Sequence, residues 1–242
     1  MNKYYYDFHL HSCLSPCGDN DNTPANLAGM ATLNHLNVIA LTDHNTCRNC
    51  PAFFRAAKAQ GIIPIAGMEL TTAEDIHIVF LFEMLADAIS FSDYLETRRI
   101  LIENRPDIFG DQWSMTEEDE GLSIDPYLLS NATTVTVDEC PSLAERFNGI
   151  CYPAHVDRQA NGIIATLGTF PDIEGFRCCE FHDASKIEEY KKLNPAILKR
   201  HIIVSSDAHF LWDMKEAEEF FLIDVEPYSS ELVRKRIFEA LR

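Results

Sequence analysis

Six of the nine histidines in this 242-residue chain lie beside carboxylates, in short motifs spread from residue 7 to residue 209. The motifs are DFHLH (7–11), TDH (42–44), GMEL (67–70), DIHIV (75–79), PAHV (153–156) and SDAH (206–209). Imidazole and carboxylate groups together bind Zn, Mn or Fe. No single motif holds enough ligands for a closed site, so the fold must bring the motifs together. This pattern is typical of a multinuclear catalytic centre, and a metal-dependent hydrolase is the first hypothesis.

The elements that must position these motifs follow an alternating pattern. Short apolar, β-branched runs predict strands at 4–10, 37–42, 62–66, 76–82, 150–153, 176–181, 201–205 and 219–224. Between them, Thr23-Pro24 is typical of a helix start, and Pro51 and Gly61 bracket a second helix. Strands that alternate with helices predict an α/β fold with a parallel sheet, for which a closed barrel is one solution.

In a parallel barrel the carboxyl ends of the strands converge, so residues that follow strands would meet at one face. His9 and His11 are two apart on a predicted strand and therefore share a face. His44, Glu69 and His155 each follow a strand, as do Asp207 and His209. His77 lies near the beginning of its strand, which does not fit this simple picture.

Residues 84–148 interrupt the alternation and carry 14 Asp and Glu against 4 Arg. We expect a helix near 90–104, loops, and a helix near 138–148, forming an acidic insertion on a single barrel domain that spans 1–242. The run 117–120 is acidic throughout, which is typical of a solvated loop. Because of its position, a second hypothesis is that this insertion covers the mouth of the barrel and selects the substrate.

Composition limits the partners and the location. Acidic residues outnumber basic ones 38 to 20, for a formal charge of −18, which disfavours binding to a phosphate backbone. We therefore expect a small phosphorylated substrate, whose charge bound divalent ions would balance, and no long nucleic acid.

The first motif begins at residue 7, which leaves no room for a signal peptide, and no apolar run approaches the roughly 20 residues of a membrane span. We expect a cytoplasmic protein without a membrane partner.

The eight cysteines are most simply read as reduced thiols in a chain of this length. Cys13 and Cys17 follow one histidine motif, and Cys47 and Cys50 follow another. A four-cysteine zinc or iron–sulfur site is the alternative, but the spacing of the first pair is loose.

The ordered set H-x-H, TDH, G-x-E, lone His, AH and SDAH resembles the PHP (polymerase and histidinol phosphatase) family of metal-dependent phosphoesterases. The resemblance covers nearly the whole chain, with 84–148 as its least certain part. It implies an irregular seven-stranded β/α barrel, similar to a TIM barrel, that carries a helical and loop insertion.

The resemblance also implies a centre of two or three Zn, Mn or Fe ions. Its ligands divide into His9, His11, Glu69 and Asp207 for one metal, His77 and His155 with bridging Glu69 for a second, and His44 and His209 for a third. The third metal needs one more residue from the loop after H-x-H, where this sequence departs from the family pattern. Asp19 is our choice, with Cys17 and Asp21 as alternatives. Catalysis would depend on Asp207, Glu69 and His209.

Two metals can share a hydroxide and stabilise the attacking and leaving oxygens of a displaced phosphate ester. Arg158, three residues after His155, is a candidate phosphate clamp because its planar fork matches two oxygens. A surface ion pair with Asp157 or with the acidic insertion is an equal alternative. His182 is a candidate to contact the substrate or to protonate the leaving group, and Glu180 on the same strand is a weaker candidate.

Two other classes of function remain. Metal-dependent amidohydrolases, which cleave C–N bonds, also begin a barrel with H-x-H, but their metals are commonly bridged by a carboxylated lysine. No lysine follows an early or middle strand here, and Glu69 stands where a bridging carboxylate is needed. A non-catalytic metal-binding scaffold or sensor is the remaining alternative, which the nearly complete ligand set disfavours.

Overall fold

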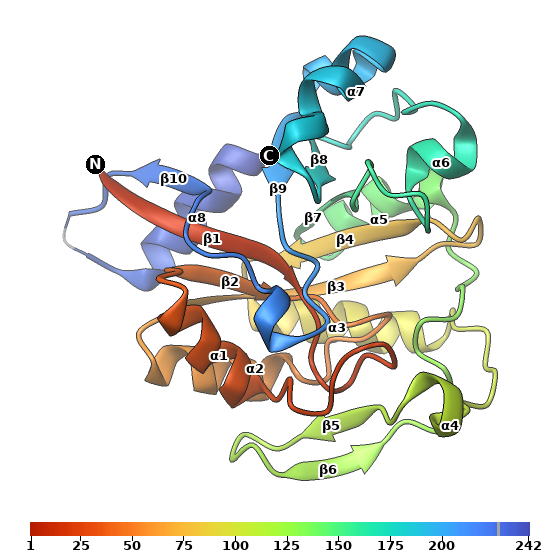
Figure 1. The fold of residues 1–242 in the computed structure, drawn as a ribbon, viewed down its shortest axis with the longest axis vertical. Coiled ribbons are helices and arrows are strands. Elements are labelled where there is room, and N and C mark those ends of the chain that lie inside the picture. Colours follow the sequence, from red (N-terminus) through yellow and green to blue (C-terminus); the bar gives the residue numbers. More distant parts are fainter. Residues whose placement is uncertain (227) are drawn as a thin grey trace.

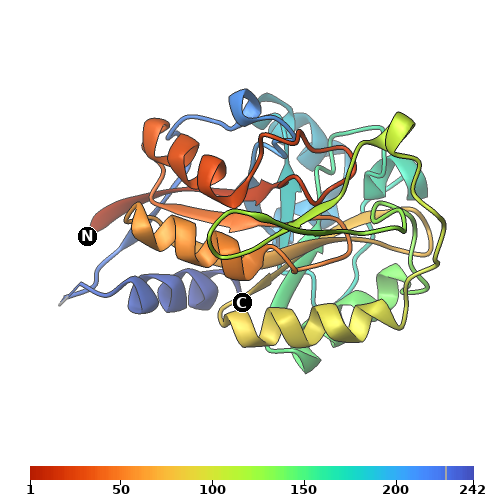
Figure 2. The ribbon, with the colours of Figure 1, turned by 90° about the horizontal axis from the view of Figure 1, so that it is seen from below.

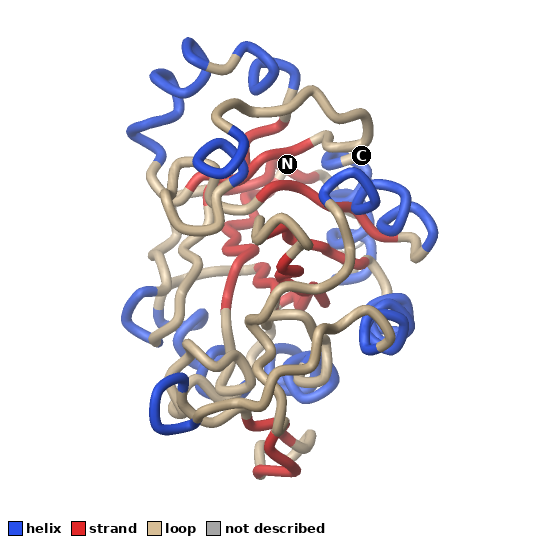
Figure 3. The backbone as a smooth tube through the Cα atoms, turned by 90° about the vertical axis from the view of Figure 1, so that its right-hand side faces the viewer, coloured by secondary structure: helices blue, strands red, loops and turns tan. Residues whose placement is uncertain are grey.

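The computed structural model describes residues 1–226 and 228–242. Strands occupy the centre and helices surround them, which confirms the predicted α/β class (Figures 1 and 3). A six-stranded sheet has the order β10–β1–β2–β3–β4–β7, and β8 pairs with β9 in a second sheet. These strands are β1 (Asn2–Leu10), β2 (Val38–Leu41), β3 (Ile63–Thr71), β4 (His77–Phe82), β7 (Gly149–Pro153), β8 (Cys178–Phe181), β9 (His201–Val204) and β10 (Phe220–Ile223).

The sheet curls toward a barrel through contacts at both sides of the β8–β9 pair. Val156 N, just after β7, donates to Glu180 O of β8 at 2.8 Å, and His11 N, just after β1, donates to Ala208 O after β9 at 3.0 Å. The predicted count of seven strands is not reproduced strictly. The hydrogen-bonded ladders stop on either side of the β8–β9 pair, and β10 adds an antiparallel strand along the first half of β1.

The expectation of a wholly parallel sheet is wrong at β4. This strand runs antiparallel to both β3 and β7. Only residues 72–76 join β3 to β4, and a connection that short can form a hairpin but not a crossover. The reversal places His77, at the start of β4, directly opposite Thr71 at the end of β3. The position of His77 near the beginning of its strand therefore agrees with a site at the carboxyl ends of the parallel strands.

Side chains alternate between the two faces of the curled sheet and form two apolar clusters. The inner cluster lies on the concave face of the sheet, and the outer cluster lies between the sheet and the surrounding helices. On β3, Ile63 and Ile65 belong to the inner cluster, whereas Ala66 and Met68 belong to the outer one. Helix α8 (Ser230–Leu241) closes the inner cluster from the amino-terminal ends of the strands. It inserts Val233, Ile237, Phe238 and Leu241, and burial of each such side chain contributes about 1.5–3 kcal/mol.

The outer cluster is covered by helices that follow the strands along the chain (Figure 2). They are α1 (Pro24–Leu33), α2 (Cys50–Ala59), α3 (Leu85–Glu96) and α5 (Cys140–Arg146), and two smaller helices, α6 (Ile163–Leu167) and α7 (Ile187–Leu193), precede β8 and β9. Thr23 caps α1 by accepting a hydrogen bond from Asn26 N, and Pro24 occupies the first turn. Within the described ranges, no helix combines the length and apolar character needed to cross a membrane.

An irregularity in β1 turns its histidines toward the interior. Phe8 belongs to the inner cluster and Leu10 to the outer one, although residues two apart in a regular strand share a face. The register between β1 and β2 shifts between Asp7 and Leu10, as it does at a β-bulge. After this shift, His9 and His11 both lie on the interior side, where the other motifs arrive.

The segment 84–148 contributes to the barrel at both of its ends. Helix α3 packs on β3 and β4, and α5 packs on β7. Between them, 97–136 leaves the barrel and contains α4 (Pro106–Phe109) and a hairpin of β5 (Trp113–Met115) and β6 (Gly121–Ile124). The sequence does not predict this hairpin.

The hairpin rests on elements next to the histidine motifs. Trp113 N donates to Cys13 O at 2.9 Å, in the loop that follows β1. At the hairpin tip, Asp119 accepts hydrogen bonds from the Thr23 hydroxyl (2.6 Å) and Ala25 N (3.1 Å), and Glu118 pairs with Arg55 of α2. Part of the acidic run is therefore bound to neighbouring helices. That the insertion selects the substrate stays a prediction.

Gly67 on β3 offers a test of how closely the strands approach beneath Glu69. A Cβ at this position would lie 2.7 Å from Phe80 O and 2.8 Å from Thr42 Cγ2, both closer than normal contact. We expect Gly67→Ala to lower the free energy of unfolding by about 1–3 kcal/mol through overpacking. The matched control is Gly29→Ala in α1, where nothing lies within 4 Å, and it should be neutral or stabilising by up to about 1 kcal/mol. Urea unfolding of both variants measures the difference, and equal effects would contradict close packing at Gly67.

Candidate metal centre

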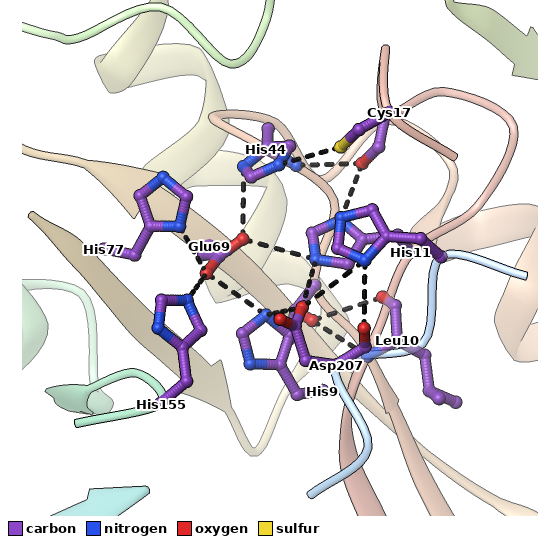
Figure 4. A network of polar contacts seen from close by, with 12 residues as sticks. His9, Leu10, His11, Cys17, His44, Glu69, His77, His155 and Asp207 are labelled. Atoms are coloured by element: carbon purple, nitrogen blue, oxygen red, sulfur yellow. Dashed lines mark hydrogen bonds and ion pairs between the residues drawn. The ribbon is translucent and has the colours of Figure 1, made fainter. Parts of the chain in front are cut away.

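The carboxylate of Glu69, at the end of β3, lies at the centre of the histidine motifs and is 1% exposed (Figure 4). Five imidazoles surround it. Its Oε1 is 2.8 Å from His77 Nδ1, 3.1 Å from His155 Nε2 and 3.3 Å from His9 Nε2, and its Oε2 is 3.1 Å from His44 Nδ1 and 3.2 Å from His11 Nε2. One carboxylate therefore faces ligand atoms on both of its oxygens, as a bridging group must.

Asp207 reaches the same place from the segment after β9. Its Oδ1 lies 3.3 Å from the Nε2 atoms of both His9 and His11. Asp207 has a φ of 52° and His155 a φ of 26°, conformations that non-glycine residues adopt at a cost of about 1–3 kcal/mol each. The contacts of the site hold both residues in these conformations.

Three groups of potential ligands have atoms within 4.8 Å of one another. They are His9, His11, Glu69 and Asp207; His44, Glu69 and His77; and His11, His44 and His209. His155 joins them through its contact with Glu69. The structure thus brings together all the predicted ligands except Asp19, and it gathers them from both ends of the chain.

Several atoms that face the middle of the cluster are buried without a hydrogen-bond partner. Among the described residues they include His9 Nε2, His11 Nε2, His44 Nδ1, Glu69 Oε2 and Asp207 Oδ1. Burial of an unsatisfied polar atom costs about 1–3 kcal/mol. Divalent cations between these atoms would remove that cost, so the donor set fits a multinuclear metal site.

The pKa shifts show how strongly these groups interact. Burial acts to raise the pKa of Glu69, but the charges of His77 and His9 outweigh it and hold that pKa well below its usual range. Burial also opposes protonation of His9, yet Glu180 and Glu69 raise its pKa well above the usual value. Burial and the nearby histidines lower the pKa of His44. Without metal the carboxylates thus hold protons on part of the cluster, and cations would displace them.

Two networks orient the histidines of β1. Glu180 Oε1, on β8, lies 2.7 Å from His9 Nδ1 and also accepts a hydrogen bond from His155 N at 3.1 Å. With Nδ1–H donating to Glu180, Nε2 of His9 is directed at Glu69 and Asp207. Sequence reasoning gave Glu180 little weight, although its place on β8, two residues after the inward-facing Cys178, is a usable signal.

His11 is oriented through a hydroxyl. Ser15 Oγ lies 2.8 Å from His11 Nδ1 and donates to Asp43 Oδ1 at 2.9 Å. Asp43, which the sequence suggests as a group that orients a ligand, therefore acts on His11 through Ser15, and the Ser15 hydroxyl is the part that sequence reasoning missed. Asp7 instead accepts hydrogen bonds from the backbone N atoms of His9 (3.3 Å) and Ser206 (3.0 Å), and so ties β1 to the segment after β9.

The Asp19 carboxylate is not one of the clustered ligands, although Asp19 N donates to His209 O at 2.9 Å. Its Oδ1 accepts a hydrogen bond from Asp21 N at 2.8 Å in an exposed turn, and neither residue belongs to a ligand group within the described part of the chain. Cys17 belongs to none of these groups either, but its Sγ lies 3.2 Å from His44 Nε2. Cys13, Cys47 and Cys50 are buried and free, and the structure does not join them with Cys17 in a four-cysteine site.

Arg158 and His182 lie at the edge of the cluster. Arg158 pairs with Asp207 Oδ2, and its second terminal nitrogen is 3.2 Å from His182 Nδ1. The Arg158 side chain is 37% exposed, so it can also face a substrate. Burial, with the charges of Arg158 and Lys215, lowers the pKa of His182. His182 is therefore neutral at pH 7 and better suited to hydrogen bonding than to donating a proton.

Comparison with known proteins agrees with this geometry. Residues 7–123 match the model of the PHP domain family, which confirms the resemblance predicted from the motifs. The match also supports the prediction of a hydrolase. No curated protein matches the sequence.

Solved structures share the fold at low identity. Endonuclease Q from Pyrococcus furiosus, a lesion-specific endonuclease, is 17% identical over 97% of this chain and 55% of its own, with a TM-score of 0.68. A second endonuclease Q structure, in complex with a 27-mer duplex that has an abasic lesion at the active site, is 19% identical, with a TM-score of 0.66, over 98% of this chain and 57% of its own. This chain thus spans little more than half the length of these proteins.

Two further structures match nearly whole chains. One, from Bifidobacterium adolescentis, is described as a metal-dependent phosphoesterase and is 16% identical over 85% of this chain and 88% of its own, with a TM-score of 0.57. The other, an amidohydrolase from Chromobacterium violaceum with bound sulfate, is 18% identical over 89% of this chain and 91% of its own, with a TM-score of 0.60. At these identities the comparisons establish the fold.

The expected partners need correction. The sequence analysis expected a small phosphorylated substrate and no long nucleic acid, but endonuclease Q, with the same fold, holds a DNA duplex. The physical reason is that a net charge of −18 is summed over the whole chain. This sum does not describe the local electrostatic field at the candidate site. The site contains six histidines and Arg158, and it fits divalent cations.

Glu180→Gln tests the orientation of His9. Glutamine has the same shape and can accept the same hydrogen bond but lacks the charge that strengthens His9 as a ligand, so we expect metal affinity to fall about 10- to 100-fold. Competition with a fluorescent chelator measures this change. The control is Glu188→Gln on α7, whose side chain is 77% exposed, and it should leave affinity unchanged. Unchanged affinity in Glu180→Gln would contradict the role of Glu180.

Removal of metal should lower the free energy of unfolding, because the buried carboxylates and imidazoles of the cluster would then lack the cations that satisfy them. At a free metal concentration 100-fold above Kd, binding contributes about 2.7 kcal/mol. Chelation should therefore lower Tm by roughly 5–10 °C for a chain of this size. Thermal unfolding before and after EDTA treatment, and again after Zn is returned, measures the shift. Glu69→Gln should lose most of this response, and a Tm indifferent to chelation in the unsubstituted protein would argue against a bound cation.

Proposed function

We propose that this chain, whose residues 7–123 match the PHP domain, is a metal-dependent hydrolase of phosphate esters that acts on phosphodiester bonds of nucleic acid. The observation that carries the proposal is the Glu69 carboxylate, with imidazoles from separate strand ends on both of its oxygens. Support for the substrate class comes from the duplex bound by endonuclease Q. Because this chain spans about half of that protein, lesion specificity is not carried over.

In this proposal the predicted ligands hold two or three ions of Zn, Mn or Fe. The sets are His9, His11, Glu69 and Asp207 for the first ion, Glu69, His77 and His155 for the second, and His11, His44 and His209 as the neighbourhood of a third. Bound divalent ions in such a site polarise the phosphate and make water nucleophilic near pH 7. Asp207, Glu69 and His209 are the residues on which turnover would depend.

The chain's own groups complete the site around the substrate. Arg158 can present its exposed guanidinium edge to a phosphate oxygen, while its pairing with Asp207 keeps it beside the cluster. His182, held neutral, can accept a hydrogen bond from the substrate or from Arg158. Glu180 and Ser15 fix the β1 histidines before substrate arrives, so little reorganisation is needed during the reaction.

C–N bond hydrolysis is the second candidate, because the amidohydrolase from Chromobacterium violaceum shares the fold. The site itself favours phosphate esters. Glu69 occupies the bridging position, and Lys215 donates to Ser205 O at 2.9 Å rather than to the cluster. We also place the protein in the cytoplasm, where eight free cysteines would remain reduced.

Asp207→Asn is the direct test of turnover. The substitution keeps the size of the side chain but removes a charged ligand, and loss of several kcal/mol of transition-state stabilisation corresponds to about a 100-fold or greater fall in kcat/KM. The substrates are bis(p-nitrophenyl) phosphate and single- and double-stranded oligonucleotides with and without an abasic site. Each is assayed with Mn or Zn on protein that is shown to be folded.

Asp213→Asn is the matched control, since Asp213 is exposed and lies in the same segment six residues later. It should retain full activity. Activity that persists in Asp207→Asn would overturn the catalytic assignment. If the metal-loaded protein hydrolyses C–N bonds and leaves every phosphodiester intact, the protein is an amidohydrolase and this proposal is wrong.

A further inference from the structure

We propose that Cys17 is a thiolate ligand of a third metal ion, which makes this part of the centre a mixed nitrogen–sulfur site. The inference rests on the proposed metal centre but not on the substrate class. It replaces our sequence-based choice of Asp19 by a residue that the fold delivers to the histidine cluster.

The loop after β1 is held in a defined shape beside the cluster. Ser15 N donates to Ser12 O at 3.1 Å and Gly18 N donates to Ser15 O at 2.9 Å, which forms two successive turns. The Asn22 side chain then ties the end of the loop to His11 O (3.0 Å) and His209 O (2.9 Å). Cys17 lies within the second turn, so its position depends on the same segments that carry the histidines.

The Ser15 hydroxyl anchors this loop from the other side. It lies 3.2 Å from His44 N and 2.8 Å from His11 Nδ1, and it donates to the buried Asp43. The loop and the imidazoles are thus parts of one network, and Cys17 approaches His44 because of it (Figure 4).

The two ring nitrogens of His44 face different groups. Nδ1 lies 3.1 Å from Glu69 Oε2, in the centre of the site, and Nε2 lies 3.2 Å from Cys17 Sγ at its edge. His209 Nδ1 is 2.9 Å from Asp207 O, which leaves Nε2 of His209 available as a ligand. The His209 ring stacks on His11 with centroids 4.2 Å apart, so the three imidazoles lie together, and of these His44 contacts the Cys17 sulfur.

A second observation points to a cation rather than to a simple thiol–imidazole hydrogen bond. His11, His44 and His209 have ligand atoms within 4.8 Å of one another. His11 is fully buried, and its Nε2 faces the cluster without a hydrogen-bond partner among the described residues. The one lone pair of that nitrogen serves the first ion beside Glu69 and Asp207, so a third ion next to it would draw on His44 and His209, with Cys17 as a further ligand.

Sulfur also changes which metal the site prefers. Thiolate and imidazole favour Zn and related softer ions, whereas Mn and Mg prefer oxygen ligands. A carboxylate ligand such as Asp19 would not favour Zn over Mn in this way. We therefore expect Zn or Co to fill the site with Cys17 and Mn to fill it poorly.

The first experiment replaces the native metal with Co(II) in the full chain. A cobalt–thiolate bond gives a charge-transfer band in the near ultraviolet that oxygen and nitrogen ligands do not give. Cys17→Ser should lose this band and about one equivalent of bound metal, while the metal held at Glu69 remains. Cys17→Asp should recover the metal without the band. Asp19→Asn is the matched control and should keep both.

The second experiment uses the exposure of Cys17, since the other seven cysteines are buried. A thiol reagent such as DTNB should modify one cysteine of the native, metal-free protein, and Zn should protect it. Cys17→Ser should show no rapid reaction. Rapid labelling that Zn does not slow, or a band that survives in Cys17→Ser, would overturn the proposal. A failed hydrolysis assay with the band present would leave Cys17 as a ligand and count only against the proposed function.

Discussion

The buried carboxylate of Glu69 is the interaction on which the rest of the structure depends. An isolated charge in a protein interior is very unfavourable, and Glu69 is tolerated because five imidazoles lie within 3.3 Å of its oxygens. Those imidazoles come from β1 and the residue that follows it, from β4, and from the segments after β2 and β7. The strands cannot separate without exposing or unpairing this group, so the polar centre and the fold support each other.

Several local features of the fold deliver ligands to that carboxylate. The irregularity in β1 turns two histidines inward, and the reversal of β4 brings His77 to the end of β3. Gly67 lets β3 approach its neighbours closely two residues before Glu69. Each feature departs from an ideal parallel barrel, and each lies at the edge where the motifs gather. The irregularity of the barrel is therefore a condition for assembling the site.

The sequence allowed the positions of most strands and the set of clustered residues to be predicted, because apolar runs followed by His or acidic residues are strong local signals. It could not reveal that β4 runs antiparallel, since strand direction depends on how a five-residue connection folds back. The β5–β6 hairpin was missed because its strands have only three and four residues and take their stability from contacts with Cys13 and Asn49. Glu180 and Cys17 gain their importance only from neighbours that are distant in sequence.

The candidate ligands of the centre run from His9 to His209, so the first and last of them are separated by most of the chain. During synthesis, His9, His11 and His44 emerge long before Asp207 exists. The segments that carry the first ligands can offer imidazoles to passing metal ions but cannot enclose them until Asp207 has been added to the chain. The complete centre therefore cannot load before the segment after β9 has been made, and a chain that stops before that segment yields a partial, open site in place of a weaker version of the complete one.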